Sequence, residues 1–112
     1  MPVYVCGRGD DGQLGIVQSR DTPLTIVPYF ANIRLSSVAV GSGHSLFLSV
    51  DGQVYAVGRG DDGRLGLGDT LWRHEPQKIN YFTDHGIIVE NIACGSYHSC
   101  ALSNGTLYTW YV

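Results

Sequence analysis

The feature that most constrains this chain is an internal repeat. Thirteen residues from Val3 to Gly15 (VYVCGRGDDGQLG) recur from Val54 to Gly66 (VYAVGRGDDGRLG), with ten identical positions at an offset of 51. A second block, VGSGHSLFLS from Val40, returns as CGSYHSCALS from Cys94 at an offset of 54. A repeat of roughly 20–50 residues is typical of solenoids, propellers and repeat arrays, whose units bury their apolar surface against one another. We therefore expect the 112 residues to form a single region of stacked units, covering about 3–53, about 54–106 and the start of a third at 107–112.

Short β-prone runs divide each period. Leu46 to Val50 and Val54 to Val57 flank Asp51-Gly52, a hairpin signal that returns at Asn104-Gly105. Further strand candidates are 35–40, 87–94 and the runs 24–27 and 77–79, which follow Pro23 and Pro76; each proline is expected at the first residue of an edge strand. No segment of about 12 residues has helical spacing of apolar residues, so we expect almost no helix.

Four short strands per period are typical of a β-propeller blade. Counting along the chain gives two strands, then four, then three. The predicted fold class is therefore all-β: a partial β-propeller with one complete four-stranded antiparallel blade flanked by two incomplete blades. Such an array is expected to need further repeats or another chain to complete it, because a blade buries its faces against neighbouring blades.

Charge, hydropathy and cysteine content exclude several classes of function. The net charge of −3 argues against nucleic-acid binding, and no apolar run is long enough to span a membrane. Three cysteines without a C-x-x-C pair make a disulfide framework improbable. With no signal-peptide pattern after Met1, we expect an intracellular protein, cytoplasmic or nuclear.

The repeated motifs resemble a known family. GRGDDGQLG from Gly7, GRGDDGRLGLGDT from Gly58, GSGHS from Gly41 and GSYHS from Gly95 are similar to the regulator of chromosome condensation repeat. The resemblance implies seven-bladed propellers, of which this chain carries about two repeats. It departs from the family at Gly9 and Gly60, where Asn is frequent, and at Tyr111, where Gly is usual. A light-sensing branch of the family carries G-W-R-H, which the motifs GSGH and GSYH here do not match.

The Gly-rich loops permit two other interpretations, which the sequence disfavours. The G-x-G-x-x-G spacing is typical of dinucleotide binding, but that site needs a helix N-terminus, and Leu-Gly follows both copies. Asp10 and Asp61, each followed by a second Asp, would repel phosphate and lack EF-hand spacing for calcium. We therefore expect no cofactor, and we interpret the glycines as structural turn residues: Gly7, Gly9, Gly12, Gly15, Gly58, Gly60, Gly63 and Gly66.

Chemistry-bearing side chains are few. Cys94, His98 and Cys100 have zinc-ligand types but no obvious fourth ligand, so no metal is expected. No nucleophile, zincin or P-loop motif occurs, so the chain is not expected to be an enzyme.

Two interpretations apply to the motif histidines His44 and His98. Each is either a partly buried ring that bonds backbone groups between strands or, as the family resemblance implies, a residue facing a bound GTPase. Trp72 and Arg73 are residue types favoured at interfaces, although Trp72 could equally pack over a neighbouring blade. The candidate partner-binding residues are therefore His44, His98, Trp72, Arg73, Asp10 and Asp61.

The function expected from these observations is a protein–protein interaction module, part of a propeller platform that binds protein partners through rim loops. One alternative is a guanine-nucleotide exchange factor, or a fragment of one, for a Ran-like small GTPase. Another alternative is a truncated product without independent function.

Overall fold

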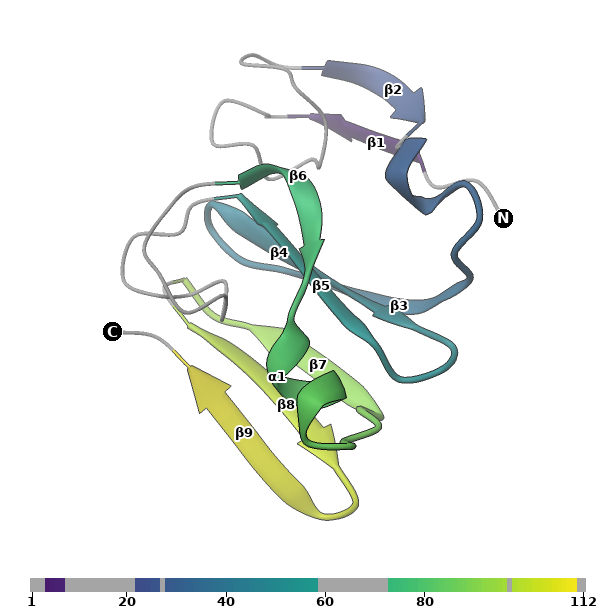
Figure 1. Ribbon diagram of the computed structural model, residues 1–112. Coiled ribbons are helices and arrows are strands. Elements are labelled where there is room, and N and C mark those ends of the chain that lie inside the picture. Colours follow the sequence, from purple (N-terminus) through teal and green to yellow (C-terminus); the bar gives the residue numbers. More distant parts are fainter. Residues whose placement is uncertain (1–3, 8–21, 27, 59–72, 97, 111–112) are drawn as a thin grey trace.

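The computed structural model describes residues 4–7, 22–26, 28–58, 73–96 and 98–110. These residues form three antiparallel sheets, which lie one after another in chain order (Figure 1). The first sheet pairs β1 (Tyr4–Gly7) with β2 (Thr22–Ile26). The second has the order β3 (Leu35–Val40), β4 (His44–Ser49), β5 (Val54–Gly58), β6 (Arg73–Lys78), and the third has β7 (Asn91–Cys94), β8 (Ser99–Ser103), β9 (Thr106–Trp110). The predicted all-β class and the series of two, four and three strands are confirmed.

Both predicted hairpins are present. The β4–β5 turn places Gly52 at φ +86°, and its N–H donates to the Ser49 carbonyl over 3.1 Å. In the β8–β9 turn, Asn104 and Gly105 have φ of +48° and +80°, the left-handed pair that a tight two-residue hairpin requires. Asn-Gly and Asp-Gly fit such turns because they adopt positive φ at little cost.

The segment before β7 differs from the prediction, because the strand expected over 87–94 begins only at Asn91. The amides ahead of it bond three separate segments instead of one ladder. Ile87 donates to the Phe82 carbonyl, Val89 to Gly52 and Glu90 to Leu102.

The prediction that Pro23 and Pro76 each stand at the first residue of a strand was also wrong. Pro23 is the second residue of β2, and Pro76 is the fourth residue of β6. Pro76 is tolerated there because β6 is an edge strand and its register with β5 shifts between Ala56 and Gly58.

Two short helical turns follow the outer strands. The 3-10 helix η1 (Pro28–Phe30) follows β2, and α1 (Asn80–Asp84) follows β6. Each turn inserts one phenylalanine into the next sheet: Phe30 packs on Phe47 and Tyr55, and Phe82 packs on Tyr108 and Trp110. The Tyr-Phe pairs at 29–30 and 81–82 are thus equivalent connectors between successive repeats.

The two central strands of the middle sheet, β4 and β5, are buried on both faces. On one face, Leu46, Leu48, Val54 and Ala56 belong to a cluster that includes Ala101 of the third sheet. On the other face, Phe47, Tyr55 and Val57 enclose Phe30. This double burial explains why β4 and β5 read as nearly continuous apolar runs instead of alternating ones.

The third sheet buries one face. Ser99, Ala101 and Ser103 are buried, whereas Leu102 and Leu107 are exposed by 36% and 65%. Their repeat equivalents in the middle sheet, Leu48 and Val54, are exposed by 3% and 0%. The stacking of neighbouring sheets, and not the residue type, therefore decides which apolar side chains are covered.

Candidate functional site

The two copies of the G-x-x-H motif form the same turn. The Gly41 N–H donates to the His44 carbonyl over 2.8 Å, and the Gly95 N–H donates to the His98 carbonyl over 2.9 Å. In both turns the imidazole lies against the glycine, so that a Cβ on Gly41 or Gly95 would lie 2.4 or 2.3 Å from the ring Cε1. Glycine is required because any side chain would displace the ring.

The two turns also contact each other. A Cβ on Gly41 would come within 2.5 Å of the Gly95 carbonyl oxygen. Positions 54 residues apart in the sequence therefore meet at one end of adjacent sheets. Gly58 and Arg73 pair at this same end, beside the start of β4. We call this end the histidine rim and define it by Gly41–His44, Gly58, Arg73, Gly95 and His98.

His44 joins two sheets within the rim. Its side chain is completely buried, and Nε2 lies 3.0 Å from the Ser99 hydroxyl at the start of β8. Ser99 also forms a side-chain hydrogen bond with Cys94. Burial raises the pKa of the Cys94 thiol to about 11. The Cys94 thiol therefore keeps its proton at physiological pH, and Ser99 bonds side chains of both the middle and the third sheet.

The structure separates the predicted partner-binding residues. His44 is buried and is a contact between sheets, whereas His98 is exposed on the rim. Arg73 begins β6 at the rim, although the structure does not describe its side chain. Trp72, Asp10 and Asp61 lie outside the described residues, as do Gly9, Gly12, Gly15, Gly60, Gly63 and Gly66.

The two remaining turn glycines end strands. Gly7 is the last residue of β1, and Gly58 is the last residue of β5. Gly58 has a φ of +112°, and a Cβ there would lie 2.3 Å from the Gly43 carbonyl oxygen. Both the backbone conformation and the close approach of the neighbouring turn require glycine at this position.

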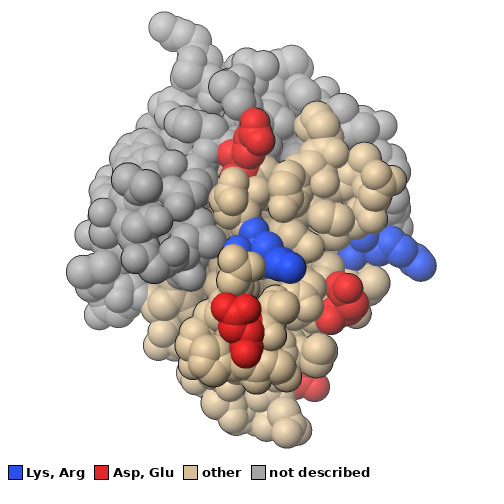
Figure 2. Space-filling model, in the orientation of Figure 1, with Lys and Arg blue, Asp and Glu red and all other residues tan. Residues whose placement is uncertain are grey.

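Within the described part of the chain, no group of three or more His, Cys, Asp or Glu side chains is placed to hold a metal ion. Cys94 and Cys100 are free thiols. No helix in the described ranges is long and apolar enough to cross a membrane. On the face shown in Figure 2, the visible acidic and basic side chains are interspersed and form no patch of one sign.

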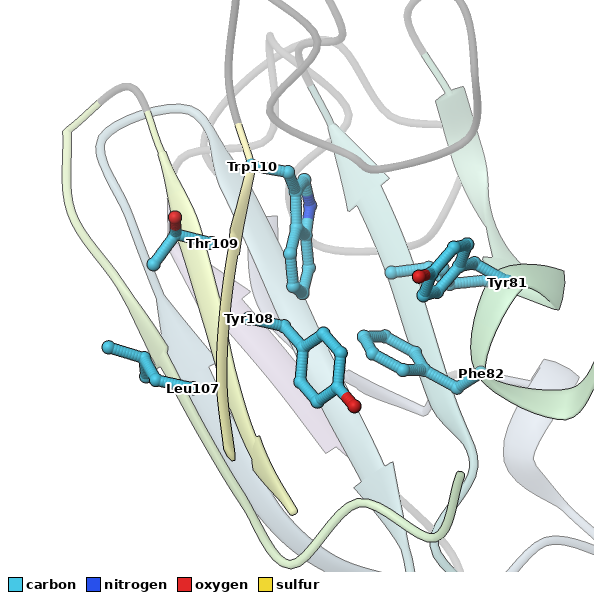
Figure 3. A pocket seen from close by; sticks show the side chains of 7 residues that line it. Tyr81, Phe82, Leu107, Tyr108, Thr109 and Trp110 are labelled. Carbon is cyan, nitrogen blue, oxygen red and sulfur yellow. The ribbon is translucent and has the colours of Figure 1, made fainter. Parts of the chain in front are cut away.

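A concave feature lies between α1 and β9. It is an open hollow of about 490 Å³, and its largest side chains are aromatic (Figure 3). Tyr108 and Trp110 of β9 point toward Phe82, while Leu107 and Thr109 point to the other side of the strand. We call this feature the β9 hollow; its lining residues are Ile79, Tyr81, Phe82, Leu107, Tyr108, Thr109 and Trp110.

The sequence analysis did not predict the β9 hollow, although the two repeats differ in where they carry a large side chain. The middle sheet has Phe47 and Val57 where the third sheet has Ala101 and Trp110. The large side chain thus moves from the central strand to the outermost strand of the third sheet. Trp110 Nε1 is buried, and among the described residues it has no hydrogen-bond acceptor.

Stacked antiparallel sheets, joined by equivalent connectors and carrying the same Gly-x-x-His turn at one rim, define a segment of a β-propeller repeat protein. The chain belongs to the regulator of chromosome condensation (RCC1) repeat family. The RCC1 repeat matches residues 2–48 and 51–102, and a second form of the same repeat matches residues 35–64.

Relatives and solved structures agree with this assignment. The chain is 42% identical to the ultraviolet-B receptor UVR8 of Arabidopsis thaliana and 40% identical to the human E3 ubiquitin-protein ligase HERC2, over 98% and 96% of its length. It spans 25% of the first relative and 2% of the second. Yeast RCC1 (Prp20), solved bound to Kap60, superimposes with a TM-score of 0.85 at 27% identity. Human WBSCR16 superimposes with a TM-score of 0.86 at 25% identity; both superpositions cover 98% of this chain and 28% of the other.

Proposed function

We propose that this chain acts as a protein–protein interaction module, as part of an RCC1-type propeller platform, and that it works by binding and not by catalysis. The observation that carries the proposal is the histidine rim, where turns from successive repeats meet and His98 is exposed. Loops held by rigid sheets are well suited to recognition, because little backbone order has to be gained when a partner binds.

The solved relatives support a binding role. One is yeast RCC1 in complex with Kap60, and another is Prp20p from Saccharomyces cerevisiae, studied for its binding properties to Gsp1p and histones. This chain covers 28% and 29% of those chains, so its own partner is part of the proposal. The interspersed charges in Figure 2 suit a protein partner better than a polyanion.

The test compares the two ends of the sheets. A photo-reactive amino acid replaces His98 at the rim or His85, an exposed histidine that follows α1. We expect cross-links to a protein partner from position 98 and few from position 85. Equal yields from both positions, or yields from position 85 alone, would contradict binding at the rim.

Guanine-nucleotide exchange on a Ran-like GTPase remains a second candidate, supported by the structural match to Prp20p. Exchange requires only that the nucleotide-free GTPase be bound more tightly than the nucleotide-bound form. Release of labelled GDP from Ran, measured with and without the chain, tests it directly. A release rate unchanged at saturating chain concentration would exclude exchange while leaving the binding proposal open to the cross-linking test.

A further inference from the structure

The end of the third sheet that lies opposite the histidine rim carries a second hollow. β8 runs from Ser99 beside the rim to Ser103, where the β8–β9 turn begins (Figure 1). An open hollow of about 470 Å³ lies there, between the segment 86–90 and the hairpin 103–108. We call it the Glu90 hollow; its walls include Ile88, Glu90, Ser103, Asn104, Thr106 and Tyr108.

The Glu90 hollow lies on the face of the third sheet that is turned toward the middle sheet. Tyr108 pairs with Ala101 of β8, and directly paired residues share one face of a sheet. Ala101 belongs to the apolar cluster that joins the third sheet to the middle sheet. The Ser103 hydroxyl donates to the Ile88 carbonyl over 2.6 Å, which holds the segment 86–90 on this same face.

This end of a sheet is accessible in the middle sheet too, which has its fourth strand. Val50 is the repeat equivalent of Asn104, and it is 61% exposed. Ile88 is 59% exposed although the β4–β5 turn packs on it, since a Cβ on Gly52 would lie 2.4 Å from Ile88 Cγ2. The opening of the hollow at Ile88 and Asn104 is therefore a property of the hairpin end and does not depend on the outer edge of β9.

Glu90 gives the hollow a negative charge in a fixed place. Its Oε1 accepts a hydrogen bond from the Asn104 N–H over 2.8 Å, which orients the carboxylate. Oε2 accepts no hydrogen bond from the residues that the structure describes, so it is available to a ligand. None of the described residues that line the hollow is a lysine, an arginine or a histidine. A cation that pairs with Glu90 inside the hollow therefore has to come from a ligand.

The two repeats differ at the walls of the hollow. Arg34 and Ser36 of the middle repeat correspond, at an offset of 54, to Ile88 and Glu90. The serine that ends the central strand and the tyrosine of the next strand are the same in both repeats. A cationic position has thus become apolar and a neutral position has become acidic, while the framework is retained. This combination suits a ligand that is aliphatic along its stem and basic at its tip.

We propose that the Glu90 hollow binds a lysine side chain of a partner protein, within a segment whose neighbouring residues are aliphatic. The ammonium group bonds Glu90 Oε2, and the methylene stem lies along Ile88 and the half-buried ring of Tyr108. Arginine fits less well, because a bidentate pair needs both carboxylate oxygens and the Asn104 N–H already holds one. Ile88 and Val50 offer exposed apolar surface to the aliphatic neighbours. The inference does not depend on the histidine rim being a binding surface.

The test is an NMR titration of the isotope-labelled chain with the peptide acetyl-Leu-Lys-Leu-amide. We expect saturable shifts of the Ile88 and Asn104 amides, the second of which bonds Glu90 directly. Norleucine in place of the lysine keeps most of the stem and removes the charge, so it should weaken binding by roughly fivefold to tenfold. Arginine in the same place should weaken binding by about threefold, because only one carboxylate oxygen is available.

Variants of the protein test the same contact from the other side. Glu90→Gln removes the charge but keeps an oxygen for the Asn104 N–H, so the turn is retained and binding weakens by roughly fivefold to tenfold. Asp51→Asn is the matched control, since it removes an exposed carboxylate of the β4–β5 turn, outside the hollow, and should leave the affinity unchanged. Ile88→Arg introduces the residue of the middle repeat, whose charge neutralises Glu90, and should abolish binding. Circular dichroism checks that each variant retains its sheet content.

The proposal is overturned if the peptide gives no saturable shifts, if the norleucine peptide binds equally well, or if Glu90→Gln and Asp51→Asn have the same effect. Tighter binding of putrescine, a diamine without a peptide backbone, would also contradict it. His85 directly precedes Gly86, which lines the hollow. The cross-linking comparison at the rim is therefore made in the Ile88→Arg background, so that a partner in the hollow adds nothing at position 85. The two proposals can then fail independently of each other.

Discussion

Phe82 should be the principal anchor between the middle and third sheets, and Phe82→Ala tests this directly. The ring is 2% exposed and lies 5.5 Å from Tyr108 and 5.7 Å from Trp110, measured between ring centroids. A buried aromatic side chain removes roughly 150–250 Å² from water, which is worth about 4–6 kcal/mol at 25 cal/mol per Å². A compact unfolded state lowers this to about 3–5 kcal/mol, the usual range for Phe→Ala in a core. We expect about 3–4 kcal/mol, because the adjoining β9 hollow admits water to the vacated space.

Urea unfolding followed by circular dichroism measures this loss. With a slope of about 1–3 kcal/mol per molar urea, the midpoint should fall by roughly 1–4 M at an unchanged slope. Tyr81→Ala is the matched control, since Tyr81 is 51% exposed and its removal should cost less than about 1 kcal/mol. Phe82→Leu, expected to cost about 1–1.5 kcal/mol, remains measurable if the alanine variant does not fold. Losses that are equal for Phe82→Ala and Tyr81→Ala would refute the anchoring role.

Three further predictions concern the histidine rim and the residues beside it. A double-mutant cycle of His44→Ala and Ser99→Ala should give a coupling of about 0.5–1.5 kcal/mol in unfolding experiments, since both groups are buried and 3.0 Å apart; additive losses would show that the bond contributes nothing. Gly41→Ala should destabilise the chain by about 1–3 kcal/mol, because the added Cβ meets the His44 ring and the Gly95 carbonyl; an unchanged melting temperature would show that the turns can separate without cost. The pKa of Cys94 is raised to about 11 from 9.0, so the folded state keeps the thiol proton at pH values where the unfolded state has lost it. This contribution is complete below pH 9 and is lost as the pH rises toward 11; Cys94→Ala should remove that part of the alkaline loss in a pH series, and an identical profile would contradict it.

The sequence by itself determined the fold class and the number of strands in each sheet. The offset of about 50 residues, the Asp-Gly and Asn-Gly turns and the apolar runs between them are local signals, and the series of two, four and three strands followed from them. Local signals suffice here because a blade is built from hairpins whose turns depend on a few adjacent residues. They failed before β7, where the amides of Ile87, Val89 and Glu90 bond three separate segments.

Only the tertiary structure decided what the equivalent residues do. His44 and His98 occupy the same motif position and form the same turn, yet one is buried against the next sheet and the other is exposed. Leu48 and Leu102 are likewise equivalent, and only Leu48 is covered. The physical reason is that stacking supplies half of each blade's burial, and a repeated sequence does not state which neighbour stands beside each copy.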